Sequence, residues 1–174
     1  MQSYLEIRVP VRMDSLWYSS LKRVLRDVPV RWQNGFYHIT VAFLDETPVG
    51  VDLRPILDGH LKGAAAPVLT FDRLDAFKTQ GGGFVIYLTA SQVPESFLSL
   101  TKSIRDDMEK AGCVIQSAFK LHVTLGRVRR DAGIGLGGLK RLVASVSLPA
   151  MTMALTDVDL REFRGWTIYE TKLK

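Results

Sequence analysis

The stretch FYHITVAFL, residues 36–44, places His38 and Thr40 two positions apart inside an otherwise apolar run. In a β-strand, residues two positions apart point to the same face of the sheet. An imidazole and a hydroxyl therefore project side by side, while Ile39 and Val41 turn the other way, toward a core. The chain has three histidines, so the placement of one inside a predicted strand calls for an explanation.

The same pattern occurs a second time in FKLHVTLGRV, residues 119–128, where His122 and Thr124 follow His38 and Thr40 by 84 positions. A single His-x-Thr on a strand is most often a partly buried histidine that its neighbours satisfy. With 11 threonines in 174 residues, chance would give two of three histidines a threonine at this spacing in roughly 1% of cases. The repetition therefore favours a functional pair.

The composition is that of a folded protein with an ordinary core. Hydrophobic residues make up 47% of the chain and charged residues 24%, and no low-complexity or polar tract indicates disorder. We expect one domain covering residues 1–174, with two pseudo-symmetric lobes. The net charge of +5 favours anionic partners such as phosphates or nucleic acid, although it identifies none of them.

The N-terminal segment has charged residues at Glu6, Arg8 and Arg12, which interrupt any apolar core of a signal peptide. No window approaches the roughly 18 apolar residues of a membrane span. The single cysteine, Cys113, cannot form an internal disulfide. We therefore expect a location in the cytoplasm and no binding to membranes. We also expect a monomer.

Hydrophobic periodicity predicts strands and helices in a similar order in the two halves of the chain. Asn34-Gly35, between two strand-like runs, predicts a hairpin. Residues 67–78 and 83–90 predict an antiparallel pair, and Arg164-Gly165 joins the last two strands. The predicted strands are residues 3–11, 30–32, 36–45, 67–78, 83–90, 113–117, 119–128, 151–163 and 165–174, and the predicted helices are 14–29, 52–63, 91–111 and 135–145.

Two His-x-Thr strands brought together would line a cleft with two imidazoles and two hydroxyls. Cleaving a phosphodiester with water needs a base for the attacking water and an acid for the departing oxygen. Imidazole, whose pKa is about 6.5, can take either role near neutral pH. Hydroxyls can hydrogen-bond the non-bridging oxygens. This chemistry needs neither a metal nor a cofactor, and His60 and Cys113 show no zinc-ligand spacing.

The paired H-x-T-x motifs resemble the signature of the two-histidine (2H) phosphoesterase superfamily. Within it, the chain is similar to the bacterial, LigT-like branch called RNA 2',3'-cyclic phosphodiesterase or 2'-5' RNA ligase. The resemblance extends over essentially the whole chain. It implies a bilobal α+β fold in which duplicated β-α-β units form two antiparallel sheets that face each other across a central groove.

The resemblance also implies roles for individual residues. His38 would be the general acid and His122 the general base, with Thr40 and Thr124 binding the phosphate. Arg127 matches a basic position of the second motif, but five positions after the histidine it leaves the imidazole face by simple alternation. It would have to reach the phosphate from a strand end or a bulge, and otherwise it is a solvent-facing arginine.

Phe43 matches an aromatic position that can stack on a base, and a core phenylalanine is the alternative. The implied activity is metal-independent hydrolysis of a 2',3'-cyclic phosphate, on an RNA end or a nucleotide, to a 2'-phosphomonoester, with reverse 2'-5' ligation. Other substrates, such as ADP-ribose 1'',2''-cyclic phosphate or an oligonucleotide end, stay open. So does a non-catalytic RNA-binding module. His60 lies outside both motifs, in a predicted helix, and is not part of the expected site.

Overall fold

The computed structural model describes residues 2–163 and 165–174, and these form four helices and eleven strands. Nine strands make one antiparallel sheet in the order β11-β10-β1-β3-β8-β6-β5, with β2 beside β8 and β7 beside β3. A second sheet pairs β4 with β9. The bounds are β1 Ser3–Val9, α1 Leu16–Val24, β2 Val30–Trp32, β3 Tyr37–Glu46, α2 Arg54–Leu61, β4 Val68–Phe71, β5 Arg73–Lys78, β6 Phe84–Thr89, α3 Glu95–Lys110, β7 Val114–Gln116, β8 Val123–Val128, α4 Leu136–Ala144, β9 Met151–Ala154, β10 Asp157–Glu162 and β11 Thr167–Lys172.

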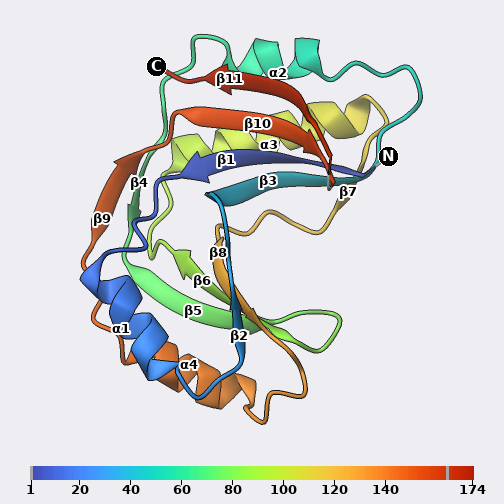
Figure 1. The fold of residues 1–174 in the computed structure, drawn as a ribbon. Helices are drawn as coiled ribbons and strands as arrows, with labels where there is room; N and C mark the ends of the chain where they lie inside the picture. Colours follow the sequence, from blue (N-terminus) through green and yellow to red (C-terminus); the bar gives the residue numbers. More distant parts are fainter. Residues whose placement is uncertain (1, 164) are drawn as a thin grey trace.

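The large sheet has two halves that meet at β3 and β8 (Figure 1). We call β11, β10, β1, β3 and β7 the β3 half, and β8, β6, β5 and β2 the β8 half. The described register joins them at one pair of residues, Ile39 and Val123. The predicted α+β fold is confirmed. The two expected sheets are halves of one sheet that bends at this junction.

Two of the four helices in the described part of the chain, α1 and α3, are exchanged between the halves. Helix α3 follows β6 of the β8 half but packs on β3 and β7, and α2 packs on α3 and β11. Helix α1 follows β1 of the β3 half but packs on α4, which covers β5. Trp17, Tyr18 and Leu21 form the buried face of α1, at the spacing of an amphipathic helix. The units β1-α1-β2 and β6-α3-β7 therefore contribute to both halves.

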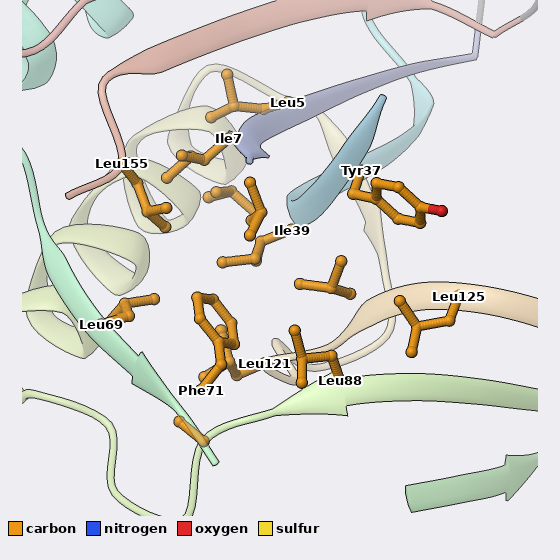
Figure 2. Close-up of a cluster of buried hydrophobic side chains, with 14 of the residues drawn as sticks. Leu5, Ile7, Tyr37, Ile39, Leu69, Phe71, Leu88, Leu121, Leu125 and Leu155 are labelled. Atoms are coloured by element: carbon orange, nitrogen blue, oxygen red, sulfur yellow. The ribbon is translucent and has the colours of Figure 1, made fainter. Parts of the chain in front are cut away.

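The core lies between the two halves (Figure 2). Ile39 and Leu5 from the β3 half and Leu88 and Leu125 from the β8 half are fully buried there. Phe71 of β4 is also fully buried and fills space between the halves. The apolar residues beside each motif threonine therefore anchor the strand, as alternation predicts.

The hairpin predicted at Asn34-Gly35 is wrong, because β2 pairs with β8 rather than with β3. A turn does form, and Gly35 has φ +83°, a conformation that favours glycine. Close packing explains the different partner. A Cβ atom added to Gly126 of β8 would lie 2.5 Å from Val30 Cγ1, so the absent side chain makes room for β2.

Other boundaries differ where a strand changes sheet. The run 67–78 divides at Asp72, since β4 pairs with β9 and β5 pairs with β6. The predicted pairing of this run with 83–90 is thus confirmed for β5. Arg164, in the turn predicted between the last two strands, lies outside the described residues. Within the described ranges, no helix combines the length and apolar character needed to cross a membrane.

Candidate active site

The two motifs lie on adjacent antiparallel strands on either side of the Ile39–Val123 pair. An antiparallel register about this pair puts each motif histidine across from the threonine of the other motif. Ile39 and Val123 are fully buried, so the motif side chains share the opposite face. The structure thus brings together four residues that were predicted from the sequence: His38, Thr40, His122 and Thr124.

A β-bulge follows each motif threonine. In β3, Val41 has no partner because the register against β1 shifts between Thr40 and Ala42. In β8, Leu125 is the extra residue, and the register against β6 shifts in the same way. A bulge reverses the alternation of the residues beyond it. The duplication therefore includes the bulge as well as the motif.

The bulges decide where Phe43 and Arg127 point. Phe43 lies opposite Tyr4, on the face that also carries Thr40 opposite Glu6. Arg127 lies opposite Val85, two positions from the partner of Thr124, so it shares the Thr124 face. Phe43 and Arg127, each five positions after its motif histidine, thus both lie on the face of the histidines. Their contacts with a substrate stay predictions.

The imidazole of His122 is oriented by a backbone carbonyl two residues earlier in the chain. Its Nδ1 lies 2.9 Å from the carbonyl oxygen of Lys120, and a carbonyl can only accept a hydrogen bond. Nδ1 must therefore carry the proton, which leaves Nε2 with a free lone pair. The rings of Phe77 and Tyr87 stand edge-on to the imidazole, with centroids 5.5 and 6.0 Å away.

Burial lowers the pKa of His122, and the charges of Lys120 and Arg127 lower it further, although the hydrogen bond to the Lys120 carbonyl opposes them. Since the ordinary pKa of histidine is about 6.5, His122 is neutral near pH 7. A neutral imidazole with a free Nε2 lone pair is the form that a general base requires.

His38 faces a carboxyl group instead. Its Nδ1 lies 3.6 Å from Oε2 of Glu6, whose side chain is fully buried on β1. Glu6 lies opposite Thr40 in the sheet. Among the described residues, neither Glu6 oxygen has a hydrogen-bond partner, and neither has Nδ1 of His38.

The pKa values of this pair are shifted in opposite directions. Burial, followed by the charges of His122, Arg127 and Arg161, lowers the pKa of His38 to about 4. Burial raises the pKa of Glu6 to about 7; the charge of Asp159 adds to this effect, and Arg161 and Arg8 oppose it. At neutral pH, His38 is therefore uncharged and Glu6 holds a proton in about half of the molecules.

Sequence reasoning missed the cationic and aromatic groups next to His38. Arg8 lies opposite His38 in the sheet. The guanidinium carbons of Arg8 and Arg161 lie 4.6 and 5.1 Å from the ring centroid of Phe36. Arg8 also donates to Asp159 at 2.6 Å. The alternation of polar and apolar residues in the first strand showed that Glu6 and Arg8 share a face, but it did not show that this strand lies next to β3.

The other expected features lie elsewhere. His60 pairs with Asp107 at 2.9 Å and links α2 to α3, outside both motifs. Cys113 is a buried free thiol. Across residues 2–163 and 165–174, no group of three histidine, cysteine or acidic side chains has an arrangement that could hold a metal ion.

Three solved structures illustrate the likeness of this fold to known proteins. E. coli LigT, crystallised with 3'-AMP, is 20% identical, with 99% of this chain and 95% of that chain covered and a TM-score of 0.53. TT0787 of Thermus thermophilus is 16% identical, with coverages of 99% and 97% and a TM-score of 0.56. Kluyveromyces marxianus Usb1 is 10% identical, with coverages of 99% and 98% and a TM-score of 0.67. At these identities, the likeness concerns the fold.

A search of curated proteins gave no match by sequence. A family model described as the 2'-5' RNA ligase superfamily does match, and it covers residues 19–165. This range includes both His-x-Thr motifs, both bulges and the junction between the halves. The chain therefore belongs to the 2'-5' RNA ligase superfamily, a group of two-histidine (2H) phosphoesterases.

Proposed function

We propose that this chain is a metal-independent phosphodiesterase that opens 2',3'-cyclic phosphates, on RNA ends or on nucleotides, to 2'-phosphomonoesters. Residues 1–174 would act as one domain whose two halves each supply one histidine and one threonine. The observation that carries the proposal is the antiparallel Ile39–Val123 pair, around which both motifs face the same side of the sheet.

In the proposed reaction, Nε2 of His122 takes a proton from water, and the water oxygen attacks phosphorus. The bond from phosphorus to O3' breaks, and O3' takes a proton from Nε2 of His38. The hydroxyls of Thr40 and Thr124 and the guanidinium of Arg127 hydrogen-bond the non-bridging oxygens, whose charge must be stabilised throughout. If a 5'-hydroxyl took the place of water, its oxygen would attack phosphorus as the bond to O3' breaks, and the product would be a 2'-5' linkage, formed as a weak ligation.

The surroundings of the two histidines support these roles. The Lys120 carbonyl holds the Nδ1 proton of His122 and so leaves Nε2 free to act as a base. Nδ1 of His38 faces Glu6, a group that can carry a proton. A base and an acid are therefore available at neutral pH without a bound cation.

A nucleotide substrate agrees with the groups on the Thr40 face. Phe43 is half-buried there, and its ring centroid lies 5.9 Å from that of Phe163. We propose that Phe43 stacks on the base next to the cyclic phosphate. The structural relative LigT has been crystallised with 3'-AMP and with NADP+, which makes a nucleotide a reasonable first ligand to test.

The direct test is to incubate the protein with each 2',3'-cyclic mononucleotide in EDTA and to follow the products by ³¹P NMR, which distinguishes 2'- from 3'-phosphates. We expect the 2'-phosphate and a loss of about 10³-fold in His122→Ala. His60→Ala is the matched control, because His60 lies outside the site, and it should stay fully active. Full activity in His122→Ala would refute the assignment.

A panel that includes ADP-ribose 1'',2''-cyclic phosphate and short oligonucleotides would separate substrates within the same chemistry. A non-catalytic RNA-binding module is the competing class. It predicts RNA binding that survives loss of both imidazoles, with no turnover of any cyclic phosphate, since phosphate binding depends mainly on cationic side chains.

A further inference from the structure

We propose that Glu6 is the proton store behind His38, so that the proton delivered to the leaving oxygen is replaced from the Glu6 carboxyl group. This inference rests on the proposed function and deepens it. Glu6 touches neither substrate nor water in this proposal and acts through His38. It is therefore a positioning residue that also supplies the proton.

The arrangement of β1 and β3 favours this role. Glu6 and Thr40 are directly opposite each other in the sheet, and Oε2 of Glu6 lies 3.6 Å from Nδ1 of His38. Catalytic hydrogen bonds are often long before substrate binds and tighten in the complex. Shortening by about 0.7 Å, well within side-chain rotation, would give a normal hydrogen bond.

The ion pair that Glu6 forms with Arg161 is long. Nη1 of Arg161 lies 3.8 Å from Oε1 of Glu6, and within the described residues neither Glu6 oxygen has a hydrogen-bond partner. The neighbouring buried carboxylate, Asp159, differs because Arg8 donates to it at 2.6 Å. A fully buried carboxyl group without such a partner is costly, so a proton on Glu6 relieves that cost.

Burial keeps a proton on Glu6 in part of the resting molecules, although the charges of Arg161 and Arg8 oppose it. Burial and Asp159 raise the pKa of Glu6 to about 7, and burial, His122, Arg127 and Arg161 lower the pKa of His38 to about 4. Both motif histidines are then neutral near pH 7. The groups that act on the pair come from all the strands packed on it: Tyr4 and Arg8 of β1, Asp159 and Arg161 of β10, Arg127 of β8, and His122 just before β8.

The proton transfer balances without any further reactant. When substrate binding has shortened the contact between Glu6 and His38, the Glu6 O–H donates to Nδ1 of neutral His38, whose proton is on Nε2. As the bond from phosphorus to O3' breaks, the Nε2 proton moves to O3' and the Glu6 proton moves to Nδ1. His38 stays neutral in its other tautomer, and Glu6 becomes a carboxylate that Arg161 and Arg8 stabilise. After product release, Nε2 of His38 takes a proton from solvent and Nδ1 returns its proton to Glu6, which restores both groups.

The pH dependence of kcat/KM tests this step, using Glu6→Gln, which keeps the volume and the hydrogen bond but cannot release a proton. In the wild type, activity should fall above an apparent pKa near 7, as Glu6 ionises. In Glu6→Gln, we expect about a 30-fold loss at pH 7 and a shift of the falling limb by at least one pH unit to lower pH. Asp75→Asn, which removes a half-buried carboxylate from the β8 half, should leave the limb in place.

An unchanged falling limb in Glu6→Gln would overturn the proposal, because the bound phosphate would then charge His38 without help. NMR titration of the Glu6 carboxyl carbon, assigned with the same variant, needs no turnover. A Glu6 midpoint near 7 supports the proposal, and one near its ordinary value overturns it. If the midpoint is near 7 but the wild type opens no cyclic phosphate, the proposed function fails while the proton store behind His38 stands.

Discussion

The His38 and His122 sides of the site have the same backbone but different neighbours. Each has a histidine, a threonine two positions later and a bulge at the next position. Around His122 the neighbours are a backbone carbonyl and the rings of Phe77 and Tyr87. Around His38 they are a buried carboxyl group and two arginines. Duplication therefore fixes where the imidazoles lie, and the adjacent strands determine which proton each can exchange.

One position shows the difference clearly. The residue opposite the motif threonine is Glu6 in the β3 half and Tyr87 in the β8 half. The Tyr87 hydroxyl donates to Asp75 at 3.2 Å and so is already committed, whereas Glu6 has a carboxyl group facing His38. An acid is thus expected on the Glu6 side and a base on the other.

The largest expected effect separates acid from base. His38→Ala and His122→Ala should each reduce hydrolysis of a 2',3'-cyclic phosphate by about 10²–10⁴-fold. Replacing the leaving oxygen of the substrate with sulfur removes the need for an acid, because a thiolate is a far better leaving group than an alkoxide. With this substrate, His38→Ala should recover to within about tenfold of the wild type, and His122→Ala should not. Recovery of His122→Ala instead would reverse the two roles.

The second prediction concerns stability and the opposed pKa shifts. Because the pKa of Glu6 is raised from 4.5 to about 7, the folded state binds a proton that the unfolded state releases in this window. The free energy of unfolding should therefore fall as pH rises from 4.5 to 7, by about 3 kcal/mol. The pKa of His38, lowered from 6.5 to about 4, gives the opposite slope between pH 4 and 6.5.

In the wild type, these slopes nearly cancel below pH 6.5. In Glu6→Gln, the free energy of unfolding measured with urea should then rise as pH rises from 4 to 6.5. In His38→Asn, it should fall as pH rises from 4.5 to 7. His122→Asn is the control, since no carboxyl group faces that ring in the described structure. If the free energy of unfolding changed with pH in the same way in all three variants, the opposed pKa shifts would not distinguish the His38 side from the His122 side.

The third prediction concerns Arg127, which lies five positions after His122. Arg127→Ala should lower kcat/KM by about 30-fold, because a charge-assisted donor to the phosphate is lost. It should also raise the pKa of both histidines, since the charge of Arg127 lowers both. Arg129→Ala is the control, because Arg129 is exposed and paired with Asp131 at 2.8 Å. Unchanged histidine titration by NMR would place Arg127 outside the site.

The sequence predicted the features that depend on local pattern. The spacing of His38 and Thr40, repeated at His122 and Thr124, was enough to locate the motif strands, because alternation in a strand is set by backbone geometry. It could not locate Glu6 or Arg161, since strand neighbours depend on long-range pairing. The partner of β2 was also out of reach, because it depends on the missing side chain of Gly126 fitting against Val30.

The smallest expected effect concerns Phe43, which lies five positions after His38. If its ring stacks on a base, Phe43→Ala should raise KM for cyclic mononucleotides about fivefold to tenfold and leave ribose 2',3'-cyclic phosphate, which lacks a base, unaffected. Phe43→Leu separates this role from packing, because leucine fills apolar space without a π-face. A Leu variant with normal KM, beside an Ala variant that only loses stability in urea unfolding, would assign Phe43 to the core. Of the two residues that lie five positions after a motif histidine, Arg127 alone would then contribute to the site.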